Sequence, residues 1–195
     1  MNHQHHFIVH LASMLFGTFI LVLITSGLSF GQLNDHPACC YSLEYAIAHP
    51  DEIEALDISN TNLSELPWQI GNMTNLKELK LNNNSLSSLP WQIGNLANLQ
   101  YLDVSNNVLS ELPWQIGNLT NMKSLKLGYN NLSALPWQIG NLTNLHNLDL
   151  SNNSLTDIPW QISNLTKLRS FNLQGNDISN KENISTKLPY CKIIY

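Results

Sequence analysis

The chain has 195 residues, and its 14 aspartates and glutamates outnumber its 9 lysines and arginines to give a formal net charge of −5. An acidic chain without a basic stripe is not expected to bind nucleic acid. Residues 32–195 are enough for one domain with a continuous core and leave no room for a second.

The first 31 residues have the pattern of a secretory signal peptide. Residues 7–30 are mainly apolar, and Ser29, Phe30 and Gly31 form a small-x-small cleavage site before Gln32. No lysine or arginine lies ahead of this run, only the amino terminus and clustered histidines, which are not expected to bind a metal. Because about 20 apolar residues can span a bilayer, an uncleaved signal anchor is the alternative. Cleavage predicts a secreted or cell-surface protein, and an anchor predicts a membrane-attached one.

Residues 32–52 are predicted to form an N-terminal cap. Apolar residues at helical spacing indicate a helix over residues 42–48, and the pair His49-Pro50 ends it. Seven acidic residues and no lysine or arginine precede Pro67. This acidic end is either a solvated surface or a docking site for a basic partner.

A 23-residue repeat follows and decides the expected fold. Its unit reads L-x-x-L-x-L-x-x-N-x-L-x-x-L-P-W-Q-I-G-N-L-T-N, and the first and last copies depart from it, as capping turns require. A fixed period of this length predicts a solenoid of about six turns over residues 53–179. The string Pro-Trp-Gln-Ile begins at Pro67, Pro90, Pro113, Pro136 and Pro159.

Each unit changes its apolar spacing once. Leu79 and Leu81 alternate with Glu78 and Lys80, the pattern of a short strand with one buried face. From Leu89 the apolar spacing becomes i, i+4, i+7, which indicates a short helical turn over residues 90–96 that is opened by proline. One parallel strand in each turn places a concave sheet on one side and the helical or 3₁₀ turns on the convex side.

An asparagine follows the strand in five of the units. At the bend behind the strand, a side-chain amide can bond the backbone of adjacent turns, so we interpret these residues as structural. They are Asn84, Asn107, Asn130, Asn153 and Asn176.

The unit resembles the leucine-rich repeat family, in the 23-residue class with the signature L-P-x-x-I-G-x-L, over residues 53–178. The resemblance implies a curved, right-handed α/β solenoid that binds its partner through the concave face. Similar units occur in Ras-suppressor-like intracellular proteins and in bacterial secreted and surface proteins.

The outward column between the two strand leucines carries alternating charges. Since lysines and aspartates face one another on adjacent strands, each lysine is expected to contact two aspartates in a self-neutralising ladder. The alternative is a polar recognition strip, which includes Glu78 beside the column. The column consists of Asp57, Lys80, Asp103, Lys126, Asp149 and Asn172.

Two tyrosines on neighbouring central turns are the preferred candidates for ligand contact. Tyr101 and Tyr129 lie in the two columns that flank the charged one, and both are expected to face solvent. Tyrosine combines a large contact area with a polar tip and is frequent in binding hot spots.

Five tryptophans follow the repeated prolines and are expected to point away from the core. We favour an arrangement in which the indoles cover one another, and the alternative is an apolar convex stripe for a membrane, a glycan or a protein. They are Trp68, Trp91, Trp114, Trp137 and Trp160.

Residues 180–195 lose the repeat but end in apolar residues, which predicts a C-terminal cap folded across the last turn. Cys39 and Cys191 lie beyond opposite ends of a stack about 24 Å long. A disulfide between them is excluded because its Cα atoms must lie within about 7 Å of each other. For Cys39, Cys40 and Cys191 we favour free buried thiols over a vicinal bridge or an intermolecular bond.

No phosphate-binding loop, zinc-protease motif or nucleophile elbow is present in the sequence, so no enzymatic activity, cofactor or metal is expected. The predicted function is a non-catalytic recognition module, exported or at the cell surface, that binds a protein or glycan. The alternatives are an intracellular Ras-suppressor-like scaffold or signalling regulator and a membrane-anchored receptor fragment.

Overall fold

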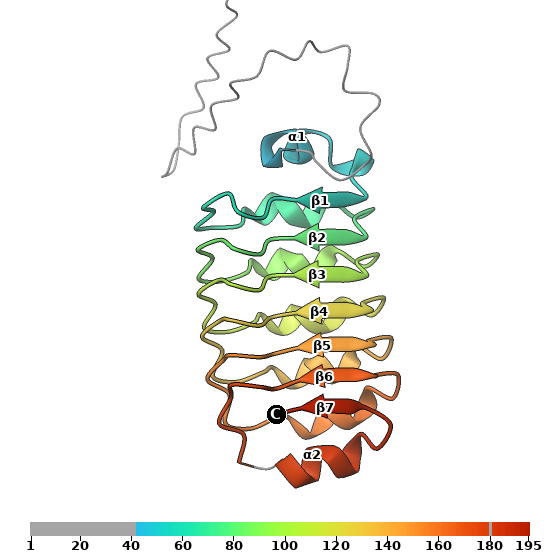
Figure 1. Ribbon diagram of the computed structural model, residues 1–195. Helices are drawn as coiled ribbons and strands as arrows, with labels where there is room; N and C mark the ends of the chain where they lie inside the picture. The colour runs from blue at the N-terminus through green and yellow to red at the C-terminus, as the bar shows by residue number, and fades with distance from the viewer. Residues whose placement is uncertain (1–41, 180) are drawn as a thin grey trace, which may run out of the picture. The chain divides into compact units, whose positions relative to one another are not determined.

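The computed structural model describes residues 42–179 and 181–195, which form one stack of similar turns (Figure 1). The predictions of a signal peptide or signal anchor and of the state of Cys39 and Cys40 concern residues outside this range. Seven short parallel strands form a single sheet in chain order. They are β1 (Ala55–Asp57), β2 (Glu78–Lys80), β3 (Tyr101–Asp103), β4 (Ser124–Lys126), β5 (Asn147–Asp149), β6 (Ser170–Asn172) and β7 (Lys192–Ile194).

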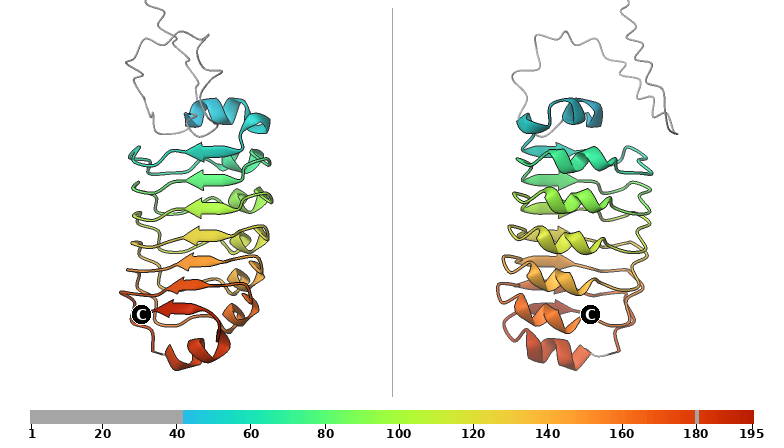
Figure 2. Two further views of the ribbon diagram at one scale, coloured as in Figure 1. Left: turned by 45° about the vertical axis from the view of Figure 1, so that its right-hand side comes forward. Right: turned by 180° about the vertical axis from the view of Figure 1, so that it is seen from behind.

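A 3₁₀ helix lies behind the sheet in each of the five complete repeats (Figure 2). A proline with φ between −58° and −67° precedes every one of these helices, so its missing N–H and fixed φ cause no loss at the helix start. The helical turn predicted over residues 90–96 is thus confirmed, with the helix itself at Trp91–Asn95. The five are η3 (Trp68–Asn72), η4 (Trp91–Asn95), η5 (Trp114–Asn118), η6 (Trp137–Asn141) and η7 (Trp160–Asn164).

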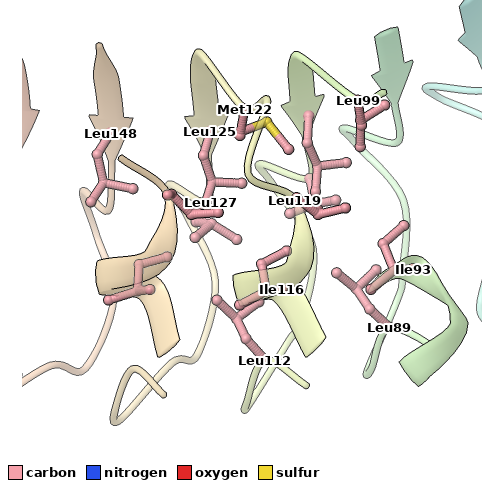
Figure 3. Close-up of a cluster of buried hydrophobic side chains, with 14 of the residues drawn as sticks. Leu89, Ile93, Leu99, Leu112, Ile116, Leu119, Met122, Leu125, Leu127 and Leu148 are labelled. Carbon is pink, nitrogen blue, oxygen red and sulfur yellow. The ribbon is translucent and has the colours of Figure 1, made fainter. Parts of the chain in front are cut away.

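The core lies between the sheet and the 3₁₀ helices and runs through every repeat (Figure 3). From β1 to β6 the strand register pairs each residue with the one 23 positions later, so that Leu79 lies opposite Leu102 and Leu102 opposite Leu125. Each repeat therefore buries its leucines against identical positions of its neighbours. This is why a repeat unit of this kind is stable only in a stack.

Glycine in the helices permits the close approach of neighbouring turns. A Cβ atom on Gly71, Gly94, Gly117 or Gly140 would lie 2.6–2.8 Å from the Cβ and carbonyl oxygen of the glutamine in the next helix. In η7 this position is Ser163, and η7 packs against a different element, helix α2 (Lys181–Lys187). The glycine is therefore required only where another 3₁₀ helix follows.

The five asparagines that were predicted to be structural connect adjacent turns at the bend after each strand, and we call them the asparagine ladder. Asn107 accepts a hydrogen bond from the Leu86 N–H at 2.9 Å and donates to the carbonyls of Leu81 and Val104 at 3.0 Å. Asn84, Asn130, Asn153 and Asn176 make equivalent bonds. Each amide thus pairs buried backbone groups of two turns at once.

The two ends of the stack carry different elements. At the start, Ser42 caps α1 (Leu43–Ala48), and α1 and η2 (Pro50–Glu52) both contact η3. The helix expected over residues 42–48 is confirmed. At the other end, α2 leads into β7, which extends the sheet by a seventh strand where the sequence predicted about six turns.

The seventh strand, β7, does not follow the leucine pattern of the repeat, because it lies at the edge of the described sheet. Ile193 pairs with Phe171 and packs on the core, and within the described residues no further strand pairs with β7, so a full set of leucines is not needed there. The free thiol of Cys191 is partly buried against the same core, and this burial raises its pKa above the usual value.

Replacing Asn107 by alanine should lower the free energy of unfolding by about 1–3 kcal/mol, because the Leu86 N–H stays buried without a partner. The carbonyls of Leu81 and Val104 each keep a bond from a neighbouring asparagine. Asn98→Ala is the matched control, since Asn98 makes one exposed bond, to the Thr74 carbonyl. Equal losses for both variants in urea unfolding would contradict a special role for the buried ladder.

Replacing Gly117 by alanine should lower the free energy of unfolding by about 1–3 kcal/mol, because the new Cβ meets backbone atoms of Gln138 that have no room to move. The corresponding control is Ser163→Ala, where no 3₁₀ helix follows and little change is expected. Thermal unfolding of the two variants measures the difference. A Gly117→Ala protein as stable as the wild type would show that the turns can separate without loss.

Candidate functional site

The sheet face carries the charged column in the order expected, but the ion pairs are fewer than predicted. Lys80 Nζ lies 3.8 Å from Asp57 and 2.8 Å from Glu78, and Lys126 Nζ lies 3.4 Å from Asp103. Among the described residues neither lysine pairs with the aspartate of the following strand. The prediction that each lysine contacts two aspartates is therefore wrong, and the column is not a continuous ladder.

The second contact of each lysine is with a residue other than an aspartate of the charged column. Lys80 turns to Glu78 on its own strand, and this hydrogen bond raises the pKa of Lys80 above its usual value. Asp103, which faces Lys80 across the sheet, is already engaged by other groups. The charges therefore form two separate clusters, one around Lys80 and one around Lys126.

Asp103 is the centre of the second cluster and is only 7% exposed. Its Oδ1 accepts from the backbone N–H of Ser105 at 3.1 Å and from the Ser105 hydroxyl at 2.6 Å. Its Oδ2 accepts from the Tyr101 hydroxyl at 3.1 Å and lies 3.4 Å from Lys126 Nζ. A buried carboxylate is thus fully paired, and it holds both a tyrosine and a lysine in place.

Lys126 completes this cluster from the next strand. Its Nζ lies 5.3 Å from the centre of the Tyr101 ring. Hydrogen bonding to Tyr101 raises the pKa of Lys126 above its usual value, with a further contribution from the charge of Asp103. The lysine is therefore charged at neutral pH and stays exposed on the sheet face.

Tyr129 lies in the turn that follows β4, and its backbone is unusual. Its φ is +56°, in the left-handed region, where asparagine occupies the equivalent position in four other repeats and Gly175 in the last. Its side chain is 58% exposed. The two tyrosines therefore differ, because Tyr101 is partly buried in the Asp103 cluster whereas Tyr129 projects from the edge of the sheet.

Sequence analysis placed Tyr129 in the correct column but did not recognise that the residues of this column have a left-handed backbone. The signal was available in the asparagines Asn60, Asn83, Asn106 and Asn152, since asparagine tolerates left-handed backbone better than other non-glycine residues. Val108, on the turn before Tyr129, is a second exposed apolar side chain at this edge that sequence analysis did not single out. Among the described residues Asp149 has fewer partners than Asp103, and its Oδ1 accepts a hydrogen bond from the Ser151 N–H.

The tryptophan row, formed by Trp68, Trp91, Trp114, Trp137 and Trp160, occupies the first position of the five 3₁₀ helices, on the face opposite the sheet. These side chains are 55–64% exposed, and among the described residues none of them forms a ring-stacking pair. The expectation that the indoles cover one another is wrong. At the first position of each 3₁₀ helix, more than half of the tryptophan stays open to solvent, so neighbouring indoles do not bury it.

The described part of the chain offers no group of three or more histidine, cysteine, aspartate or glutamate side chains that could hold a metal ion. A hollow beside the last turns has a mainly basic polar lining, formed by His146, Thr166, Lys167, Leu168, Arg169 and Tyr190. Over residues 42–179 and 181–195, no helix has the length and apolar character needed to cross a bilayer.

Comparisons with known proteins agree with the architecture. A family model described as a leucine-rich repeat region matches residues 56–189. No curated protein matches the chain. A solved leucine-rich repeat protein of Leptospira interrogans is 32% identical with a TM-score of 0.67, over 80% of this chain and 46% of that one.

Two further solved structures contain extracellular or signalling proteins. One is the ectodomain of the Arabidopsis thaliana membrane receptor kinase GASSHO1/SCHENGEN3 in complex with Casparian strip integrity factor 2, with 27% identity and a TM-score of 0.60 over 66% of this chain and 16% of that one. The other is the Drosophila Toll–Spätzle complex, with 25% identity and a TM-score of 0.69 over 75% of this chain and 22% of that one. The chain spans less than half the length of each of these three solved chains.

The matched region covers most of the chain, and the structure has the parallel sheet, the 3₁₀ helices and the asparagine ladder that the repeat predicts. Proteins with this fold are generally recognition modules without catalytic activity. The protein belongs to the leucine-rich repeat family.

Proposed function

We propose that this protein is a non-catalytic recognition module, exported from the cell, that binds a protein ligand at the edge of its sheet near β3 and β4. The observation that carries the proposal is Tyr129, a large exposed side chain held at a φ of +56°. Every other repeat with a described left-handed residue at this position uses asparagine or glycine.

The backbone of Tyr129 favours a functional explanation over a structural one. A left-handed conformation costs a non-glycine residue about 1–2 kcal/mol, and strain of this kind accumulates at functional sites. The side chain is mostly exposed and is not part of the core. A contact with a ligand would compensate for the strain.

The neighbouring cluster adds a preorganised polar surface. Asp103 holds Tyr101 and Lys126 in place through its carboxylate, so little side-chain freedom remains to be lost on binding. Together with Tyr129, these groups offer an aromatic anchor, a phenol and an ammonium within two turns. That mixture of chemistry is typical of protein-binding hot spots.

The relatives support a protein ligand. The plant receptor ectodomain and Toll were each solved in complex with another protein. For this chain a protein partner is therefore favoured over a glycan, and an extracellular location over an intracellular scaffold. The apolar segment at residues 7–30 supports export.

Export can be tested by sequencing the amino terminus of the natural protein. We expect Gln32 as the first residue, because Ser29, Phe30 and Gly31 form the cleavage site. A protein in the extracellular fraction that starts at Gln32 would support secretion. A start at Met1 would contradict cleavage, and fractionation with membranes would then indicate a signal anchor.

Ligand binding can be tested by capturing extracellular proteins of the source organism on the immobilised wild type and on a Tyr101→Ala, Tyr129→Ala double variant. We expect the double variant to lose partners that the wild type retains while its circular dichroism stays nearly unchanged. Tyr190→Ala is the control, because Tyr190 is 96% exposed and far along the chain. Identical sets of proteins on all three surfaces would place binding elsewhere.

Tyr129→Asn should raise the free energy of unfolding by about 1 kcal/mol, because asparagine relieves the left-handed strain. In a domain of this size that corresponds to roughly 2–4 °C in melting temperature. The reverse change, Asn106→Tyr, should lower stability by a similar amount at the equivalent position one repeat earlier. If Tyr129→Asn were destabilising, the tyrosine would belong to the structure and not to a ligand site.

A further inference from the structure

The tryptophan row is a second surface with a chemistry different from that of the sheet face. Its five indoles are each more than half exposed and recur once in every turn. Successive 3₁₀ helices contact one another directly through their glycines, so the indoles form an uninterrupted line. The sheet-edge site lies on the other side of the core and does not involve them.

The row carries no charge. The six-residue segment from the repeated proline to the asparagine contains only proline, tryptophan, glutamine, isoleucine, glycine, serine and asparagine in all five copies. The nearest acidic side chains, Glu65, Glu111 and Asp157, precede the row by three positions and are exposed. The surface is thus an apolar centre with a polar margin, which is the anatomy of a protein–protein interface.

The exposed area is large enough for a specific interface. With about 250 Å² for a tryptophan side chain, exposed fractions of 55–64% leave roughly 700 Å² of indole in contact with water. A monomeric soluble protein seldom exposes a contiguous apolar patch of this size. Two such rows packed together would bury on the order of 1,400 Å², within the range of about 1,200–2,000 Å² that stable complexes bury.

We propose that the tryptophan row is a self-association surface, on which two copies of this chain pack row against row. The spacing of the row is the reason for choosing a second copy. A line of side chains repeated once per turn is matched along its whole length only by a surface with the same period, and another copy has that period by construction. An uncharged row also meets its twin without electrostatic repulsion, as a two-fold symmetric contact requires.

The test is the mass of the natural protein in solution under reducing conditions, which prevent disulfide bonds through its cysteines. Sedimentation equilibrium should give twice the mass of a single protomer at micromolar concentrations. A Trp91→Ser, Trp114→Ser, Trp137→Ser variant should sediment at half the wild-type mass. Tyr190→Ser, which removes an exposed aromatic side chain outside the row, should leave the mass unchanged.

A measurement on the unaltered protein covers the case in which the triple variant fails to fold. The described tryptophans are the row itself, so their fluorescence reports the interface directly. On dilution from the associated to the dissociated state, emission should shift to longer wavelength and quenching by iodide should increase. Constant, red-shifted and readily quenched emission together with a monomer mass at every concentration would overturn the proposal.

The orientation of the pair can be read from cysteine variants in a background with Cys39, Cys40 and Cys191 changed to serine. If Trp68→Cys protein forms disulfide-linked pairs with itself, the two rows run in the same direction. If it pairs only with Trp160→Cys protein, they run in opposite directions, and either result supports self-association. The absence of both, with emission that instead shifts on phosphatidylcholine vesicles or retention of the monomer by cellulose, would assign the row to a bilayer or a glycan.

Discussion

The structure depends on one constraint, that neighbouring turns keep a short, fixed separation on every side of the stack. Strand hydrogen bonds set this separation on the sheet, the asparagine ladder maintains it at the bend, and glycines permit it between the 3₁₀ helices. A side chain that widened any one of these contacts would separate the turns there and strain the other two. The 23-residue period follows from this, because each position has to meet its own equivalent in the next turn.

Such a constraint divides the residues into two classes. Inward positions are nearly invariant along the stack, since every leucine packs against the corresponding residue of the turns before and after it. Outward positions on the sheet face and in the turn after the strand have no such partner and can differ from repeat to repeat. The charged column and Tyr129 are found there. A recognition surface can therefore vary without disturbing the core.

The two faces use this freedom in opposite ways. The sheet face is heterogeneous, with a tyrosine, a lysine and a buried aspartate brought together from β3 and β4. The helical face is uniform, with one exposed tryptophan in each of five turns. A heterogeneous surface suits a ligand of unrelated shape, whereas a periodic surface suits a partner of equal period. On this basis we propose recognition for the sheet face and assembly for the helical face.

The sequence by itself determined the repeat, the strand, the proline-initiated turn and the asparagine ladder, because each depends on spacing within about 23 residues that recurs in every copy. Only the tertiary structure decided which lysine pairs with which acidic side chain. Lys80 forms an ion pair with Glu78 on its own strand. Asp103 instead binds Tyr101, Ser105 and Lys126. The tertiary structure also showed that the indoles stay exposed. Such outcomes depend on competition among neighbours in three dimensions, which periodicity does not encode. Spacing specifies where a side chain is, and only packing specifies what it contacts.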